Sequence, residues 1–161
     1  MKNLILVRHG KSSWESLLDD IDRPLNQRGI QDANLVASNC ICFLPTTYLI
    51  WSSIAKRASE TSFHFAKKVC YPIQKIIIKS ELYTFDLNQL EKVVKSCSND
   101  EDNLILFGHN NAITDFVNKF GDILVNHIPP SGFVSLQFDT DEWGKIENGK
   151  INKIVFPKNL K

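Results

Sequence analysis

Two histidines a hundred positions apart, His9 and His109, each lie one residue beyond an apolar run that predicts a buried β-strand. The runs are residues 4–7 and 104–107, and Arg8 stands between the first run and its histidine. In an open parallel sheet the carboxyl ends of the strands share one edge, where ligands bind. We therefore expect both imidazoles to meet over one pocket. A guanidinium beside two imidazoles suits an oxyanion that a ring nitrogen can attack, and phosphate is the expected oxyanion.

The residues around the two histidines predict different roles for them. We interpret His9 as the nucleophile, because an imidazole with a reference pKa of about 6.5 is mostly unprotonated near pH 7. Its other ring nitrogen is then expected to donate to a backbone carbonyl, and Gly10 leaves room for a phosphate. His109 is interpreted as the partner of a phosphate oxygen. A helix beginning at Asn110 would direct free N–H groups at the same anion.

Polar side chains after the other predicted strands complete a set suited to phosphoryl transfer. Arg57 comes shortly after the second strand, and Glu81 follows the third. Positioning and charge stabilisation carry most of this chemistry, and an arginine fork binds two oxygens of the transferred group. Each residue alone has an ordinary structural interpretation, so it is their joint occurrence that indicates a site. His64 and His127 lack such a context and are expected on the surface or in packing.

Strand-like and helical runs alternate along most of the chain. This pattern predicts an α/β fold, a three-layer α/β/α sandwich with a mostly parallel central sheet. Asn26 is the expected N-cap of the first helix. The expected strands are residues 3–7, 48–51, 76–78 and 103–107, and the expected helices are residues 26–40, 55–70, 87–97 and 110–120.

The last part of the chain departs from this alternation. Residues 133–138 and 151–156 alternate apolar and polar side chains, and Asn148-Gly149 between them is a tight-turn signal. The pattern predicts a C-terminal β-hairpin that gives the sheet an antiparallel edge strand. No linker or internal repeat divides the chain, so we expect a single domain over residues 1–161.

Composition narrows the classes of function. A formal net charge of +1 argues against nucleic acid as a partner, and no apolar run approaches the roughly 20 residues that span a membrane. Without a signal-peptide pattern, we expect a cytoplasmic protein, and we expect a monomer. Cys70 and Cys97 end amphipathic runs and are expected to pack as small hydrophobic residues. None of the four cysteines belongs to a zinc-binding pattern, and reduced, partly buried thiols are expected: Cys40, Cys42, Cys70 and Cys97.

Several segments together resemble one known family. Residues 4–10, L-I-L-V-R-H-G, resemble the first signature of the histidine phosphatase superfamily, also called phosphoglycerate mutase-like. The stretches R-H-G-K-S-S-W (8–14) and D-I-D-R-P-L-N-Q-R-G (20–29) resemble its SixA-type phosphohistidine phosphatase branch. Three later segments are also similar to that branch: S-S-x-x-x-R-A-x-x-T (52–61), E-L-Y (81–83) and G-H-N (108–110). The resemblance covers essentially the whole chain.

The resemblance implies a covalent mechanism that needs no metal and no cofactor. In that mechanism His9 accepts the phosphoryl group and water later removes it. Arg8, Arg57 and His109 would hold the phosphate oxygens, and Arg23 would shape the mouth of the pocket. A wider set is expected to contact the substrate: Ser12, Ser13, Asp20, Arg23 and Asn110.

The resemblance leaves the general acid open between Glu81 and Asp20. Many relatives also have proline where this chain has Ile54 and Asn111, which alters the expected rigidity of two loops. Neither departure removes a catalytic group.

Protein phosphohistidine is the expected substrate. An alkoxide leaving group depends strongly on protonation in the transition state, whereas the imidazole of a phosphohistidine needs less help. The chain also lacks a long insertion that could roof the pocket, which favours a site open to a protein surface. Two alternatives stay open: a broad-specificity phosphatase of small phosphate esters, and a non-enzymatic module that binds phosphoproteins. A mutase is less favoured, because nothing in the sequence predicts a closed chamber.

Overall fold

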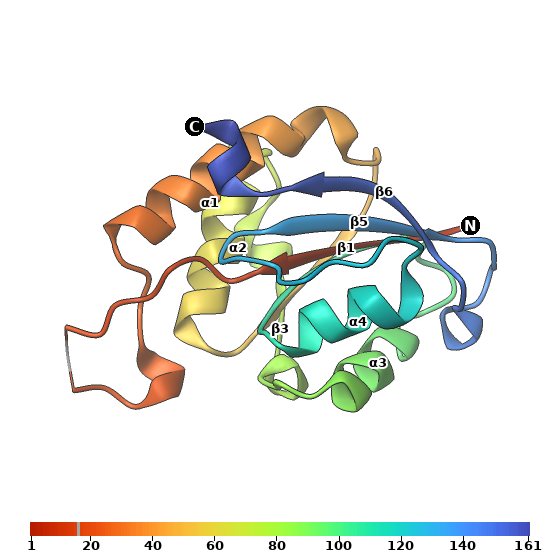
Figure 1. The fold of residues 1–161 in the computed structure, drawn as a ribbon, viewed down its shortest axis with the longest axis horizontal. Coiled ribbons are helices and arrows are strands. Elements are labelled where there is room, and N and C mark those ends of the chain that lie inside the picture. Colours follow the sequence, from red (N-terminus) through yellow and green to blue (C-terminus); the bar gives the residue numbers. More distant parts are fainter. Residues whose placement is uncertain (16) are drawn as a thin grey trace.

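A six-stranded sheet runs through the computed structural model, which describes residues 1–15 and 17–161 (Figure 1). Its strand order is β3-β2-β4-β1-β5-β6. The first four strands pair in parallel, whereas β5 runs antiparallel to both β1 and β6. This confirms the predicted mostly parallel sheet with antiparallel pairing at its C-terminal end, but the strand that runs against the others is β5 and not the edge strand β6. The strands are β1 (Lys2–Arg8), β2 (Leu49–Ser53), β3 (Ile77–Lys79), β4 (Asn103–Gly108), β5 (Phe133–Phe138) and β6 (Lys150–Val155).

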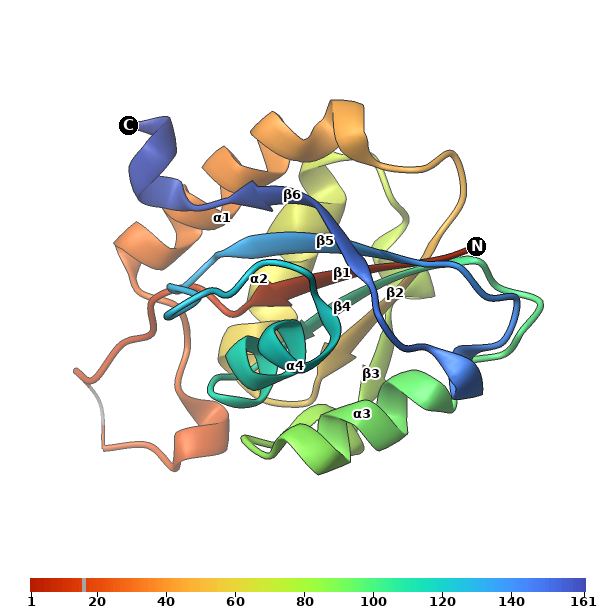
Figure 2. The same cartoon turned by 45° about the vertical axis from the view of Figure 1, so that its right-hand side comes forward.

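Helices cover both faces of this sheet, which confirms the three-layer arrangement. One pair packs together on one face and a second pair on the other (Figure 2). None of the helices in the described part of the chain has the length and apolar composition to cross a bilayer. The pair on the first face is α1 (Gln27–Cys40) and α2 (Lys56–Lys68), and the pair on the second is α3 (Leu87–Lys95) and α4 (Ala112–Phe120).

The central strand β1 explains why its sequence is continuously apolar. Leu4 and Leu6 pack into the core beneath α3 and α4, whereas Ile5 and Val7 pack into the core beneath α1 and α2. Successive side chains of a strand point to opposite faces, so a strand covered on both sides needs apolar residues at every position. The strand thus holds Arg8 and the residues after it at the edge of a well-packed sheet.

Side-chain caps fix where two helices begin. Asn26 accepts a hydrogen bond from the Gly29 N–H at 2.8 Å, which confirms the predicted N-cap of α1. Asp86 accepts from the Gln89 N–H at 3.0 Å in the same way at the start of α3. These caps satisfy N–H groups that have no partner inside the helix, and they set the direction of both helices.

The connection between β5 and β6 is longer than the tight turn that Asn148-Gly149 suggested. It runs over residues 139–149 and contains a short 3-10 helix (Trp143–Lys145) whose Trp143 side chain is fully buried. Asn148 has a φ of 48°, in the left-handed region, and β6 begins just after it. The sequence signal therefore marks the last bend of the connection rather than the whole of it.

The four cysteines are free, but they are not all buried. Cys40 and Cys97 are buried, and burial raises the pKa of the Cys40 thiol to about 12. Cys42 and Cys70 are exposed. The expectation that Cys70 packs as a hydrophobic residue is wrong, because it follows the last turn of α2 with a φ of 61° and turns out of the core.

Candidate active site

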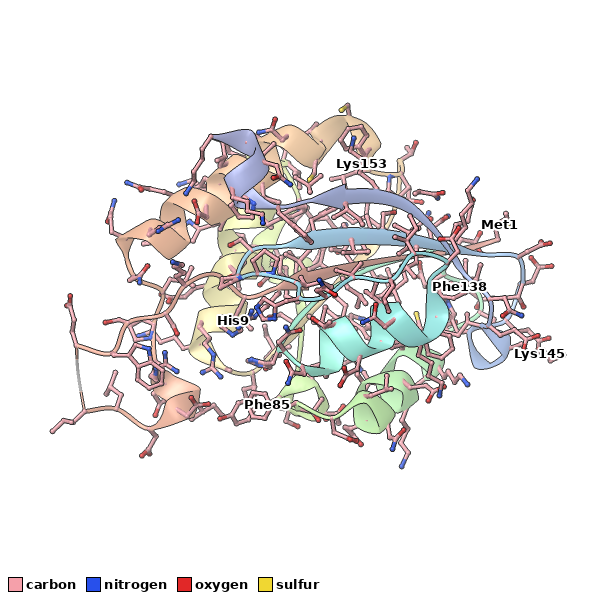
Figure 3. All side chains as sticks on the ribbon, viewed as in Figure 1. Met1, His9, Phe85, Phe138, Lys145 and Lys153 are labelled. Carbon is pink, nitrogen blue, oxygen red and sulfur yellow. The ribbon has the colours of Figure 1, made fainter. Side chains whose placement is uncertain are left out.

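Two neighbouring strands bring the histidines together. β1 and β4 pair with Arg8 opposite Gly108, so His9 and His109 leave the sheet side by side. Their ring centroids lie 5.2 Å apart, which confirms that the two imidazoles meet. Figure 3 shows His9 in the left half of the molecule with Phe85 below it, whereas Met1 and Lys145 lie at the right-hand side.

Backbone contacts hold the His9 ring in one orientation. Its Nδ1 lies 2.7 Å from the carbonyl oxygen of Gly10, the contact expected if Nδ1 carries the proton. The Gly10 N–H in turn donates to the hydroxyl of Thr61 at 2.9 Å. A Cβ at Gly10 would lie 3.0 Å from the Gly29 carbonyl oxygen, so the close approach requires glycine. Burial is the main reason that the pKa of His9 falls to about 4, and Arg57 lowers it further.

Arg57 extends from α2 toward His9 and is almost completely buried. Its Nε lies 3.4 Å from His9 Nε2. The two terminal nitrogens donate to Asp20: Nη1 to the main-chain carbonyl at 2.6 Å and Nη2 to the carboxylate at 3.0 Å. An acidic residue of the chain therefore engages the guanidinium that the sequence assigned to phosphate.

Asp20 connects several groups of the site. Its carboxylate also accepts from Arg23 at 3.1 Å and from the hydroxyl of Tyr83 at 2.5 Å. The Tyr83 hydrogen bond is the largest cause that lowers the pKa of Asp20, to about 2, and the contacts with Arg57 and Arg23 add to it. A carboxyl group with this pKa is ionised near pH 7 and has no proton to donate.

Arg23 organises the segment that follows His9. Its guanidinium donates to the hydroxyl of Ser12, and its Nε donates to the carbonyl of Ser13 at 3.1 Å. The Cζ atom of the same guanidinium lies 3.1 Å from the centroid of the Trp14 ring, so the cation packs on the face of the aromatic ring. Arg23 lines the cavity, and its role at the pocket mouth stays a prediction.

Arg8 and Asn110 share partners on the loop after α4. Arg8 Nη1 donates to the Ile128 carbonyl at 2.9 Å and lies 3.2 Å from His127 Nε2. Asn110 Nδ2 lies 3.3 Å from the same carbonyl. The Arg8 Nε is buried and has no hydrogen-bond partner among the described residues, and burial lowers the Arg8 pKa.

The start of α4 differs from the prediction. The helix begins at Ala112, not at Asn110, and the N–H of Thr114 donates to Asn110 Oδ1 at 3.0 Å. The N–H of Ile113 donates to the His109 carbonyl at 3.1 Å. The expectation of free N–H groups at this helix start is wrong for these two, because the preceding residues already supply their acceptors.

His109 is the most enclosed member of the site, with 1% of its surface exposed. Its Nε2 lies 2.8 Å from the Ser53 hydroxyl, and its Nδ1 has no partner among the described residues. The rings of Tyr83 and Phe85 each pack edge-on at 5.4 Å. Burial, followed by the charge of His9, lowers the pKa of His109 to about 3, so the ring is neutral near pH 7.

An open cavity of about 460 Å³ lies over these groups. Its wall contains predicted site residues from four separate segments: Arg8, His9, Ser12, Arg23, Arg57 and Asn110. Ser13, Asp20 and His109 do not line it. Lys11, Trp14 and Phe85 also line it. No aspartate or glutamate of the described chain lines this cavity. The arrangement offers a neutral ring nitrogen among guanidinium groups, which suits attack on an anionic phosphoryl group.

A sequence model of the histidine phosphatase superfamily (branch 1) matches residues 4–99. The chain belongs to this superfamily. The matched residues contain β1 with His9 and α2 with Arg57 but end before His109, which the fold adds to them. The predicted resemblance to the superfamily is confirmed.

Known proteins are similar to this superfamily member, one in fold and two in sequence. A structure of the protein histidine phosphatase SixA complexed with tungstate matches with a TM-score of 0.83 and 18% identity over 99% of each chain. A 2,3-bisphosphoglycerate-dependent phosphoglycerate mutase of Chlamydia abortus is 31% identical over 113 residues, which are 63% of this chain and 48% of the mutase. An uncharacterised chloroplastic protein of Arabidopsis thaliana is 48% identical over 63 residues, 37% of this chain and 28% of that protein. The chain thus spans about half the length of the mutase and less than a third of the plant protein.

One predicted site residue of this histidine phosphatase superfamily member, Glu81, lies outside the cavity, whereas His127 lies beside it. Glu81 is exposed, accepts from the Ser80 hydroxyl at 2.9 Å and does not line the cavity. Its neighbour Leu82 is buried, so the short turn that holds both directs Glu81 to solvent. His127, which was assigned to the surface or packing, is exposed but contacts Arg8 beside the cavity. No periodic pattern around His127 could have indicated this.

Proposed function

We propose that the protein is a phosphatase that carries the phosphoryl group on His9 Nε2 as a covalent intermediate. The observation that carries the proposal is the state of the His9 ring. With Nδ1 bonded to the Gly10 carbonyl, the lone pair is on Nε2, next to Arg57 Nε. A pKa of about 4 keeps this nitrogen unprotonated near pH 7. Membership of the histidine phosphatase superfamily supports the same conclusion.

The reaction takes two steps. In the first, Nε2 of His9 forms a bond to phosphorus while the bond to the leaving atom breaks, and the leaving atom keeps that electron pair and takes a proton from water. In the second, a water oxygen bonds to phosphorus, the P–N bond breaks, Nε2 recovers its lone pair and the proton of the water passes to solvent. Arg8 and Arg57 supply positive charge to the phosphoryl oxygens in both steps. No step in this scheme uses a metal or cofactor.

Protein phosphohistidine is the substrate class that this site suits best. The described residues that line the cavity include no carboxylic acid, and the neighbouring Asp20 is ionised because its pKa is about 2. A leaving group must then depart with little help from a protein acid, which favours the imidazole of a phosphohistidine over an alkoxide. The cavity is open, and the similarity in fold to a protein histidine phosphatase supports a protein substrate.

A phosphatase of small phosphate esters is the second candidate. The favouring observation is the identity of 31% with a phosphoglycerate mutase, whose named substrate is a phosphate ester. The same floor of imidazole and guanidinium groups would hold the phosphoryl group of an ester. The two candidates differ only in the leaving group.

A His9→Ala variant tests the mechanism. We expect turnover of a phosphohistidine protein to fall to the uncatalysed background, whereas His64→Ala retains the wild-type rate because His64 lies on α2 without a contact to the cavity. Brief incubation with radiolabelled substrate should leave an acid-labile, alkali-stable label on the wild type and none on His9→Ala. Wild-type turnover in His9→Ala would overturn the mechanism, and binding without any turnover would support a non-enzymatic module instead.

A substrate panel separates the two candidate classes. We expect kcat/KM for a phosphohistidine protein to exceed the values for sugar and nucleotide phosphates by at least about tenfold, which corresponds to about 1.4 kcal/mol. A preference of that size for any ester would reject protein phosphohistidine and retain the covalent mechanism.

A further inference from the structure

We propose that Ser53 is a positioning residue that holds His109 in the tautomer with its proton on Nδ1, so that this nitrogen donates to the phosphoryl group. The inference rests on the proposed phosphatase function for its last clause only. The tautomer itself follows from the hydrogen bonds around the Ser53 hydroxyl.

Ser53 ends β2, the strand next to β4, and its side chain is completely buried. Its Oγ accepts a hydrogen bond from the Ala55 N–H at 3.2 Å and lies 2.8 Å from His109 Nε2. A hydroxyl has one proton to donate and two lone pairs to accept. Ala55 occupies one of the lone pairs, and the proton still requires an acceptor.

His109 Nε2 is the only acceptor that the described residues offer to that proton. If Nε2 instead carried a hydrogen and donated to Ser53, the hydroxyl proton would be buried without a partner, which costs free energy. With Ser53 donating to an unprotonated Nε2, one group of this pair, the Nδ1–H, is left unpaired, whereas the reverse arrangement leaves both the hydroxyl proton and the Nδ1 lone pair unpaired. The first arrangement therefore has the lower energy. Because the His109 ring is neutral near pH 7, its single N–H is then on Nδ1.

The other ring nitrogen of His109, Nδ1, carries the proton in this tautomer. His109 Nδ1 is buried and has no hydrogen-bond partner among the described residues. A buried donor without a partner is unfavourable, and an oxygen of a bound phosphoryl group would satisfy it. In the reverse tautomer Nδ1 would present a lone pair to that oxygen, and the interaction would be repulsive. The orientation of one serine proton thus decides whether His109 attracts or repels the anion.

Nitrogen NMR of histidine-labelled protein without substrate tests the tautomer directly. Protonated and unprotonated ring nitrogens differ widely in 15N shift, so the spectrum assigns the proton of His109. We expect Nδ1–H in the wild type and in Ser52→Ala, and a shift toward Nε2–H in Ser53→Ala. Ser52 is the matched control, because it is equally buried but donates only to the Ser53 carbonyl. Nε2–H in the wild type would overturn the proposal, whatever the fate of the phosphatase function.

Kinetics then test the consequence. We expect Ser53→Ala to reduce kcat for phosphoryl transfer to His9 by about tenfold, as for the loss of about one hydrogen bond. Ser53→Thr, which keeps a hydroxyl, should recover most of that loss and restore Nδ1–H. Rates and tautomer in Ser53→Ala that equal those of Ser52→Ala would overturn the positioning role. If His9 proves not to be phosphorylated at all, the phosphatase proposal fails and the NMR result still decides the tautomer.

Discussion

The cavity has a floor and a rim that are held in different ways. The floor consists of Arg8, His9 and Arg57, which line the cavity, together with His109, which packs against His9 without lining it. The floor is built on strand ends and α2, and Arg57 and His109 expose only 3% and 1% of their surface. The rim consists of Lys11, Trp14 and Phe85, where the two aromatic side chains expose 78% and 52%.

This difference separates two tasks of one site. The floor contains the groups that any phosphoryl group needs, a neutral nucleophile and fixed cations, and buried packing holds them in place. The rim contacts whatever is attached to the phosphoryl group, and its exposed side chains are free to rest on a partner. We therefore expect floor changes to affect all substrates equally and rim changes to affect only some.

Removal of a floor cation should have the largest effect. We expect Arg57→Ala to lower kcat/KM by about 10²- to 10³-fold for a phosphohistidine protein and for a small phosphoramidate alike, because the transition state loses a preorganised charge. Arg28→Ala is the control, since Arg28 is exposed on α1 and its one ion pair among the described residues is with Asp32, at 3.7 Å. Steady-state kinetics on both substrates measure the loss. A loss confined to one substrate would contradict the division between floor and rim.

Burial of the floor histidines should appear in the pH dependence of stability. The pKa of His109 is about 3 in the folded state and about 6.5 in the unfolded state. Between these two pH values the folded state therefore binds fewer protons than the unfolded state. The stability from a neutral ring is complete above pH 6.5 and is lost as the pH falls toward 3. We measure the free energy of unfolding with urea. Between pH 7 and pH 5 we expect it to fall by about 2 kcal/mol less in His109→Asn than in the wild type.

His64 supplies the control for this titration, because it is half-exposed on α2 and outside the cavity. His64→Asn removes a histidine outside the site and is measured over the same pH range as His109→Asn. Equal slopes in His109→Asn and the wild type would mean that the ring titrates normally and is not enclosed.

The floor was largely predictable from sequence, and the reason is physical. Continuous apolar runs identify strands buried on both faces, and parallel pairing brings the residues after them to one edge. His9 and His109 follow from that rule, and Arg57 comes shortly after a strand end, at the start of α2. The carbonyl contact of the His9 ring follows from a separate argument, that its other nitrogen must hold the proton.

The contacts of loop residues could not be derived in this way. Asp20 reaches Arg57 only through the path of the segment after β1, and no periodic pattern encodes that path. Glu81 shares a turn with the buried Leu82, so packing of its neighbour, not its own charge, decides its direction. His127 contacts Arg8 from a loop whose path no periodic sequence pattern encodes. Such contacts depend on tertiary packing that single-sequence patterns do not contain.

A rim substitution should discriminate between substrates. We expect Trp14→Ala to lower kcat/KM for a phosphohistidine protein by about tenfold, as for an aromatic interface residue, and to change the value for a small phosphoramidate by less than about threefold. Leu124→Ala is the control, because Leu124 is equally exposed, at 80%, and does not line the cavity. An equal loss on both substrates would place Trp14 with the floor, through its contact with Arg23.

The smallest expected effect concerns Asp20, which lies between floor and rim. Its carboxylate repels a bound phosphate while it holds Arg57 and Arg23. Asp20→Asn removes the charge and keeps an acceptor oxygen, so we expect inorganic phosphate to inhibit about two- to fivefold more tightly. The gain in affinity is modest because the Asp20 side chain is 47% exposed and water screens its charge. The gain should shrink as salt is added, since salt screens exposed charges. Asp22→Asn, an exposed neighbour on the same short 3-10 helix, should leave the inhibition constant unchanged. Weaker inhibition in Asp20→Asn would instead show that the hold on Arg57 outweighs the repulsion, and Asp20 would then belong with the floor.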